Sequence, residues 1–533
     1  MSLPPELPED LETPDAAQAP EGDALEPVDR RTFLRMGAAA AASIAVGCAD
    51  DGAGLEAGSE DESAGSESAG LDEIGTSESD TGSDEAESDA ETGTDSETET
   101  DTGEPLEQCE GELIDFDPEA VALDELGFPL ALMAGEMRPD SVMLAVYIED
   151  AAPRLLRVWR PSDQPGVIDL IAEREVVPDA DGYAKLGVDG LCSGTWYRYA
   201  YFSDEDGELT ARSRVAEFRT AIAEDSLEPV VVAISACNGN SFDWPALERT
   251  AEEYYDVFCH LGDMAYNDGA FTRDEYRAKW KQYLGNEGFK SVYALAGLYA
   301  TWDDHEITDN SAFDPETEDP AQLEKKDNAL NAYFEVLPIA QAEAEDYKLW
   351  RSFRWGLSVE FFVLDCRYER RPSLGEYISQ AQMDWLEQGL MASPCHFKVI
   401  LNSVPITNMP ILWDVAADDR WEGFPGARDS LLAFIDDHQI ENVWFIAGDF
   451  HVCFVSRLEP MGTTLSARTR EIAVTGGRTN FAGDTLGLST QFDYGVGDPR
   501  GCVLTFDPAL DAVNVRFINP EGGDDYNQDL TQD

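Results

Sequence analysis

Six short apolar runs after Glu228 alternate with stretches of helical character, a pattern typical of buried strands in an α/β fold. Every run continues directly into polar residues. Because the carboxyl ends of strands line the ligand crevice of such sheets, these six endings predict one shared crevice. The runs are Val230 to Ile234, Val257 to Leu261, Leu295 to Trp302, Val359 to Leu364, Lys398 to Leu401 and Val443 to Ala447.

The segments around these runs complete an α/β pattern. Asp274 to Tyr283 and Gln380 to Leu390 are predicted to form amphipathic helices, and Pro315 to Lys326 is predicted to be a charged loop. Two further strands between Gly501 and Ile518 are expected to close the sheet. We therefore place a catalytic domain at residues 228–520.

Upstream, residues 125–222 alternate between apolar and polar side chains, with turn signals between short β-rich segments. This spacing favours a small antiparallel sandwich of the immunoglobulin or fibronectin type. The segment contains no cluster of ligand-type residues, so we assign it a structural or docking role.

The first 107 residues do not resemble a folded domain. Arg30 and Arg31 precede an apolar stretch that ends at Cys48, which predicts a twin-arginine export signal with a lipoprotein-type cleavage site in residues 1–48. Residues 49–107 are acidic and rich in Ser, Gly and Thr, a composition that predicts a disordered tether. We expect a periplasmic or cell-surface protein, lipid-anchored through Cys48.

The net charge limits the classes of binding partner, and the cysteine spacing bears on disulfide formation. Downstream of Glu104 the chain has 78 acidic and 33 basic residues, and this balance of −45 argues against long nucleic acids or an anionic lipid surface as the main partner. The nine cysteines do not have the spacing of a disulfide scaffold. Cys366 and Cys395 are candidates for a disulfide, although connectivity stays open.

Oxygen donors dominate the predicted crevice. With five histidines in the chain, a zinc site with several imidazole ligands is disfavoured. The carboxylates of Asp263, Asp304 and Asp449 suit calcium, magnesium, manganese or ferric iron. A second donor set suits a ferric ion and comprises the Tyr266 phenolate, the Cys237 thiolate and the His451 imidazole. Two such cations would clamp a phosphoryl group and generate a metal-bound hydroxide as the nucleophile.

Several motifs occur together in a specific order. They are Ser235 to Asn238, Gly262 to Tyr266, Tyr276-Arg277, Trp302 to Glu306 followed by Asp309-Asn310, Arg354 to Gly356, Leu364 to Arg367, Gln382 to Leu386 and Gly448 to His451. The ordered set resembles the alkaline phosphatase D (PhoD-like) family of the calcineurin-like metallophosphoesterase superfamily, over about Phe128 to Asn519. The resemblance implies a four-layer α/β/β/α sandwich preceded by a small all-β domain.

The same resemblance implies site residues. It places Fe³⁺ on Cys237, Asp263, Tyr266 and His451, and Ca²⁺ on the side of Asp263, Asp304 and Asp449, with Mn²⁺, Mg²⁺ or Zn²⁺ as alternative second metals. Asn402 falls where the superfamily often has a further ligand. Asp263, Asp304 and His305 are the expected catalytic residues, and Arg277, Asn310 and Arg367 the candidate substrate-binding residues.

Structural alternatives stay open for several of these residues. Cys237 could be a small buried hydrophobe, and His305 could be a supporting residue oriented by Asp303 rather than a group that donates to phosphate. Arg277 and Arg367 could be ion-pair partners, and Asn310 could cap a loop. The predicted function is an exported phosphatase or phosphodiesterase, and the alternative is a catalytically silent, surface-anchored scaffold or adhesin. Oligomeric state and the preference for monoesters or diesters stay open.

Overall fold

The computed structural model describes residues 109, 111–308, 314, 318–340 and 348–532 of the 533-residue chain. The predicted export signal, Cys48, the acidic tether and Asn310 lie outside the described residues. Nothing in the described part of the chain forms a helix with the length and apolar character needed to cross a bilayer.

A nine-stranded sheet forms one half of the predicted catalytic domain, in the order β22-β21-β20-β10-β11-β12-β2-β3-β6. β10, β11 and β12 are parallel, and β20 pairs antiparallel with β10. The strands are β2 (Met133–Gly135), β3 (Ser141–Tyr147), β6 (Tyr183–Asp189), β10 (Val230–Ser235), β11 (Val257–Leu261), β12 (Gly297–Thr301), β20 (Gly501–Asp507), β21 (Ala512–Ile518) and β22 (Asp524–Leu530).

A seven-stranded sheet forms the other half, in the order β13-β14-β15-β16-β18-β17-β19. β14, β15, β16 and β18 run parallel, so their carboxyl ends meet at one edge. The strands are β13 (Arg351–Trp355), β14 (Val359–Val363), β15 (Phe397–Leu401), β16 (Val443–Ala447), β17 (Cys453–Arg457), β18 (Arg470–Ala473) and β19 (Phe492–Val496).

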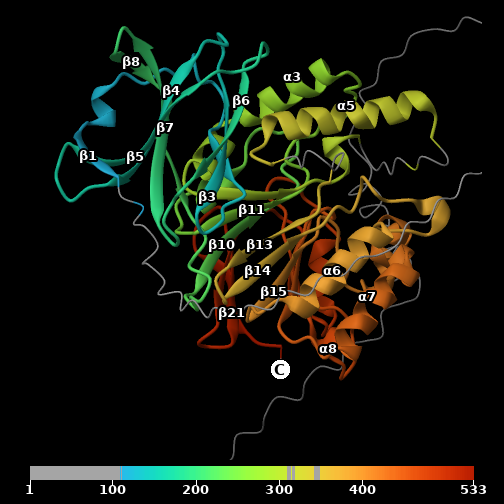
Figure 1. The fold of residues 1–533 in the computed structure, drawn as a ribbon. Helices are drawn as coiled ribbons and strands as arrows, with labels where there is room; N and C mark the ends of the chain where they lie inside the picture. The colour runs from blue at the N-terminus through green and yellow to red at the C-terminus, as the bar shows by residue number, and fades with distance from the viewer. Residues whose placement is uncertain (1–108, 110, 309–313, 315–317, 341–347, 533) are drawn as a thin grey trace, which may run out of the picture.

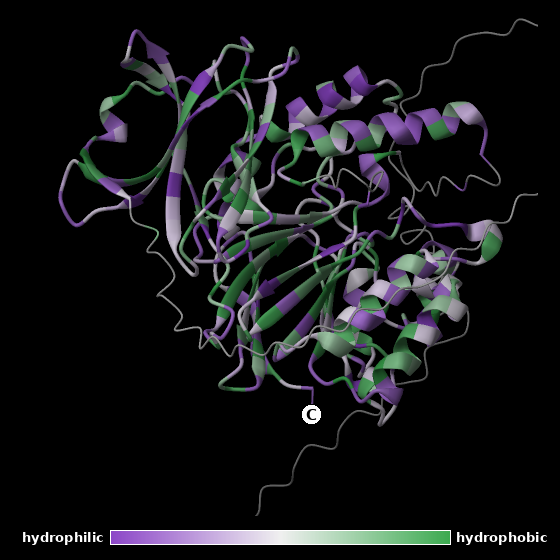
Figure 2. Cartoon of the chain, in the orientation of Figure 1, coloured by the Kyte–Doolittle hydropathy of each residue, from purple (hydrophilic) through white to green (hydrophobic). Residues whose placement is uncertain are grey.

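The two sheets pack face to face, and helices cover their outer faces (Figure 1). One core lies between the sheets, a second under the helices of the first sheet, and a third under those of the second sheet. The helices are α2 (Pro245–Thr250), α3 (Arg273–Leu284), α4 (Glu287–Tyr293), α5 (Pro320–Val336), α6 (Gln380–Ala392), α7 (Pro425–Asp437) and α8 (Leu465–Arg468). Hydrophobic residues are frequent along the strands, and hydrophilic residues along the outer helices (Figure 2). The predicted four-layer α/β/β/α sandwich is confirmed.

Part of the N-terminal β region belongs to the nine-stranded sheet. A six-stranded sheet has the order β1-β5-β4-β7-β8, with β9 paired to β7. The other strands of this region, β2, β3 and β6, belong to the nine-stranded sheet. They are connected to it through β2, where Gly135 pairs with Leu298 of β12. The additional strands are β1 (Glu112–Asp115), β4 (Arg154–Pro161), β5 (Val167–Val176), β7 (Trp196–Glu205), β8 (Glu208–Arg212) and β9 (Ala216–Arg219).

Two sequence-based expectations are wrong. A disulfide links Cys109 to Cys192, whereas Cys366 and Cys395 are free, buried thiols. The segment predicted as a charged loop from Pro315 contains the start of α5, because the Asp319 side chain accepts hydrogen bonds from the Ala321 and Gln322 N–H groups and Pro320 occupies the first helical turn.

Candidate active site

Four strand ends bring the predicted ligand residues to one place. Cys237 follows β10, Asp263 follows β11, Asp304 follows β12, and the Asp449 to His451 turn follows β16. Cys237, Asp263, Asp449 and His451 all have positive φ, between 52° and 66°. Non-glycine residues in this left-handed region are costly and concentrate at functional sites.

The first group contains a thiol, a carboxyl, a phenol and an imidazole. Ligand atoms of Cys237, Asp263 and His451 lie within 4.8 Å of one another. The Tyr266 hydroxyl lies 3.3 Å from Asp263 Oδ2 and 3.3 Å from His451 Nε2. The structure therefore brings together all four residues of the predicted iron site.

The second group consists of buried carboxylates. Ligand atoms of Asp303, Asp304 and Asp449 lie within 4.8 Å of one another, and so do those of Asp263, Asp304 and His305. Asp263 thus contacts both groups and has the position of a bridging residue. Asp303 was not predicted as a ligand, although it belongs to the same motif as Asp304.

The oxygen atoms of these groups fit cation binding. Within the described residues, Asp263 Oδ1, Asp303 Oδ2 and Asp449 Oδ2 are buried and have no hydrogen-bond partner. Burial raises the pKa of Asp263 and of Asp449 well above the usual range, since the protein lacks enough positive charge there to offset desolvation. Burial also lowers the pKa of His451 to about 3, so its imidazole is neutral and able to act as a ligand.

Arg367 lies beneath the carboxylates and is fully buried. Its guanidinium donates to Asp303 and, at 2.6 Å, to Asp419, and it lies 3.5 Å from Asp449 Oδ2. Because this side chain has no solvent exposure, the structure favours its role as an ion-pair partner over substrate binding.

Arg277 is not brought to the cluster. It lies on α3, where its guanidinium pairs with Glu335 at 2.6 Å and with Asp181 at 2.8 Å. The structure thus gives Arg277 a role in joining α3 to α5 and to the β6 side of the sheet.

Asn402 follows β15, and its side-chain oxygen accepts hydrogen bonds from Cys366 Sγ (3.0 Å) and Trp421 Nε1 (3.3 Å). This amide oxygen is therefore engaged by neighbours rather than directed at the carboxylates, which does not favour the predicted ligand role.

His305 is positioned by a residue that the sequence did not reveal. Its Nδ1 lies 2.8 Å from Asp268 Oδ2, and its ring lies 3.9 Å from the Tyr266 ring. Burial alone would lower the His305 pKa, but Asp263, Asp304 and Asp268 outweigh burial and raise that pKa well above its usual value. Asp268, not Asp303, orients this imidazole.

Glu306 is a further residue that sequence reasoning missed. Its buried carboxylate accepts hydrogen bonds from the backbone N–H groups of Asp263 (3.0 Å), Met264 (2.6 Å) and Asp303 (2.8 Å). It thereby joins the turn after β11 to the turn after β12. The only signal in the sequence was its place at the end of the Trp302 to Glu306 motif.

Residues 232–487 match the family model described as PhoD-like phosphatase. The predicted family resemblance is confirmed. The chain is 25% identical over 319 residues to alkaline phosphatase D of Bacillus subtilis (strain 168), a match that covers 51% of this chain and 53% of that relative. The chain thus spans about half the length of this PhoD-type relative.

Solved structures agree on the fold. A structure of PhoD superposes with a TM-score of 0.63 at 19% identity, over 76% of this chain and 92% of that chain. The purple acid phosphatase PPD1 from yellow lupin (Lupinus luteus) superposes with a TM-score of 0.53 at 14% identity, over 75% and 74% of the two chains. Both likenesses show that this chain shares the fold of these two phosphatases.

Proposed function

We propose that this chain is a metal-dependent phosphoesterase that hydrolyses phosphate esters. The observation that carries the proposal is the position of Asp263, which lies within 4.8 Å of Cys237 and His451 on one side and of Asp304 and His305 on the other. A carboxylate shared by two buried donor groups is the arrangement needed for a two-cation phosphoryl-transfer site.

The donor chemistry supports different ions in the two groups. Cys237, Tyr266, Asp263 and His451 combine anionic donors with one imidazole and would hold Fe³⁺. The second group offers only oxygen ligands, from Asp263, Asp304 and Asp449 together with Asp303. It would hold Ca²⁺, or Mn²⁺ or Mg²⁺ in its place. Zn²⁺ is less suited to this second group because the ligands are all carboxylates.

The bound cations would supply positive charge for the phosphoryl group and activate water for attack on phosphorus. The protein's own residues position the components. Glu306 fixes the turn that carries Asp263, and Arg367 offsets part of the carboxylate charge beneath the site. His305 would donate a proton to the leaving oxygen of the ester, and its contact with Asp268 supports this role by fixing the orientation of the imidazole.

We also propose that the protein is exported by the twin-arginine route and anchored through a lipid on Cys48. The Arg30-Arg31 pair and the apolar stretch before Cys48 support this location. The Cys109–Cys192 disulfide agrees with an oxidising compartment outside the cytoplasm.

Substitution of two ligands tests the proposed site. Asp263→Asn and His451→Ala should each lower hydrolysis of p-nitrophenyl phosphate and bis-p-nitrophenyl phosphate by roughly 10³-fold or more, because each removes a donor from the cation site. Asp437→Asn, an exposed change at the end of α7, is the matched control and should keep full activity. Wild-type turnover by either ligand variant would refute the site.

Metal content and absorption spectra separate the enzyme from the silent scaffold. The purified protein should contain iron and show a visible tyrosinate-to-iron band that Tyr266→Phe abolishes. A metal-loaded protein that hydrolyses neither ester would instead support the scaffold.

A further inference from the structure

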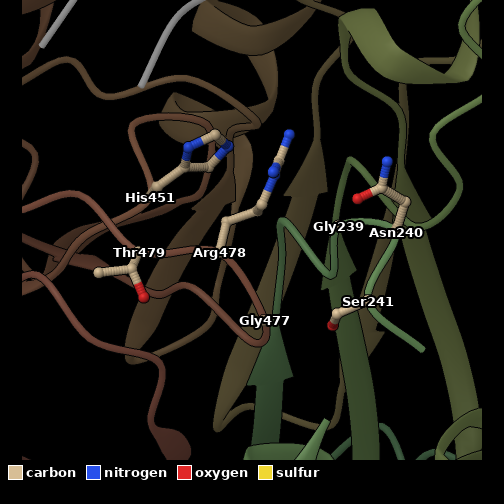
Figure 3. A pocket seen from close by; sticks show the side chains of 7 residues that line it. All are labelled: Gly239, Asn240, Ser241, His451, Gly477, Arg478 and Thr479. Atoms are coloured by element: carbon tan, nitrogen blue, oxygen red, sulfur yellow. The ribbon is translucent and has the colours of Figure 1, made fainter. Parts of the chain in front are cut away.

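A pocket of about 240 Å³ opens beside His451, and neither Asp303 nor Asp304 is among its lining residues. Figure 3 shows the Arg478 side chain extended between His451 and Asn240. The pocket is lined by Gly239, Asn240, Ser241, His451, Gly477, Arg478 and Thr479. It therefore adjoins the proposed iron group through a shared residue.

The charge of this pocket differs from that of the rest of the site. Of its described lining residues none is acidic, and Arg478 supplies a permanent positive charge. Asn240, Ser241 and Thr479 add neutral polar groups. In a chain of net charge −72, this combination offers an anion a favourable place next to the cluster.

Arg478 is held in place by the residues of the site itself. Its backbone N–H donates to the Cys237 carbonyl at 3.0 Å, and its carbonyl accepts from Thr475 Oγ1 at 2.7 Å. Its guanidinium carbon lies 5.1 Å from the centre of the Tyr266 ring. The arginine is therefore anchored to two of the predicted iron ligands.

Glycine at position 239 is needed for this arrangement. A Cβ atom there would lie 2.7 Å from Arg478 Cδ, and Gly239 also has a φ of +67°. The loop after β10 thus leaves room for the arginine stem where any other residue would displace it.

A neighbouring pocket shares Asn240 but has a different character. Its lining contains Asp268 and Lys279, together with the aromatic side chains of Phe242, Tyr266 and Tyr283. Because a carboxylate is present there, the pocket beside Arg478, whose described lining contains no acidic residue, is better suited to the oxygens of a phosphate group.

We propose that Arg478 is a substrate-binding residue that holds non-bridging oxygens of the reacting phosphoryl group, with Asn240 as a second donor. The inference rests on the proposed phosphoesterase function and assigns the phosphate subsite within it. A guanidinium forms paired hydrogen bonds to phosphate oxygens, so the dianionic group of a monoester should depend on Arg478 more than the monoanionic group of a diester.

Steady-state kinetics test the first consequence. Arg478→Met should lower kcat/KM for p-nitrophenyl phosphate by about 100-fold, and by less for bis-p-nitrophenyl phosphate. Arg478→Lys should be intermediate, because an ammonium keeps the charge without the planar pair of donors. Arg457→Met, at the exposed far end of β17, is the matched control and should match the wild type. Equal kinetics for wild type and Arg478→Met would overturn the proposal.

Binding of inorganic orthophosphate tests the subsite without turnover. By calorimetry on the metal-loaded protein, Arg478→Met should weaken the orthophosphate Kd at least tenfold, and Asn240→Asp should weaken it too by adding a carboxylate. Orthophosphate binding that is unchanged in both variants, or absent in the wild type, would overturn the subsite.

Ester kinetics and orthophosphate binding together distinguish failure of the phosphoesterase proposal from failure of the Arg478 proposal. Failure of the wild type to hydrolyse either ester would refute the phosphoesterase function, while orthophosphate binding that depends on Arg478 would still support an anion subsite. Hydrolysis by the wild type with full activity in Arg478→Met would refute the role of Arg478 alone.

Discussion

At the scale of single residues, Glu306 shows how the carboxylate oxygens of the site remain available for cations. Its carboxylate accepts the N–H groups of the turn that carries Asp263 and also that of Asp303. The backbone donors are thus satisfied by a residue that does not compete for the ligand oxygens, so those oxygens are left available for cations.

Removing this carboxylate should destabilise the protein. Glu306→Ala leaves several buried N–H groups without an acceptor, and we expect a loss of about 3 kcal/mol or more in the free energy of unfolding. Urea unfolding of the metal-free protein measures the effect, with the exposed Glu248→Ala as the matched control. An unchanged unfolding midpoint for Glu306→Ala would show that the backbone finds other partners.

The sequence allowed some site residues to be predicted because the chain places them next to recognisable strand ends. Cys237, Asp263, Asp449 and His451 are of this kind, and the structure brings them together. Asp268 and Arg478 could not be found this way, since their roles arise from contacts with His305 and Tyr266 formed only in the folded chain. Arg277 was predicted to bind substrate because it belongs to a family motif. In the folded chain its guanidinium instead forms an ion pair with Glu335 of α5, which the motif did not indicate.

At the scale of elements, local patterns were informative where burial is complete. The runs Val257 to Leu261 and Val443 to Ala447 are the strands β11 and β16 without any shift, because both are fully buried and end in a glycine turn. The start of α5 was missed because its charged first turns resemble a loop, although its Asp319-Pro320 start has the chemistry of a helix N-terminus.

The disulfide is the element-scale feature that sequence spacing did not reveal. Cys109 and Cys192 are 83 residues apart and join the segment before β1 to the turn before β7. Replacing both by serine should lower the free energy of unfolding by about 4 kcal/mol, since the closed loop is long. Thermal unfolding with and without dithiothreitol measures this loss.

The reductant itself provides the control for that experiment. Dithiothreitol should lower the Tm of the wild type and leave the Cys109→Ser/Cys192→Ser variant unchanged. A wild type that is insensitive to reductant would contradict a stabilising disulfide.

At the scale of the whole molecule, the buried acids should make stability depend on pH in an unusual direction. In the absence of metal, burial raises the pKa of Asp303 to about 6 and that of Glu306 to about 8. A buried acid with a raised pKa favours folding below its unfolded pKa, and this contribution is lost as pH rises through the folded pKa. The metal-free Tm should therefore fall between about pH 5 and pH 8.

Bound cations should reverse this trend. The aspartate side chains bind a cation in their deprotonated form, so the cation stabilises the folded protein more as the pH rises. Scanning calorimetry in about 0.5 M salt, which screens repulsion among surface acids, measures the Tm with chelator and with metal. Asp263→Asn/Asp449→Asn should show a shallower fall than the wild type with chelator. A metal-free Tm that rises with pH would contradict the account.

The pairing of Gly135 with Leu298 also determines how this protein can be divided. Because β2, β3 and β6 extend the nine-stranded sheet, β12 is an interior strand of that sheet. A fragment begun at the first strand of the phosphatase-like part would uncover the backbone donors and acceptors along Gly297–Thr301, and unprotected strand edges recruit other chains. The upstream strands thus protect the edge of β12 from pairing with other chains, and a fragment that lacks them should self-associate.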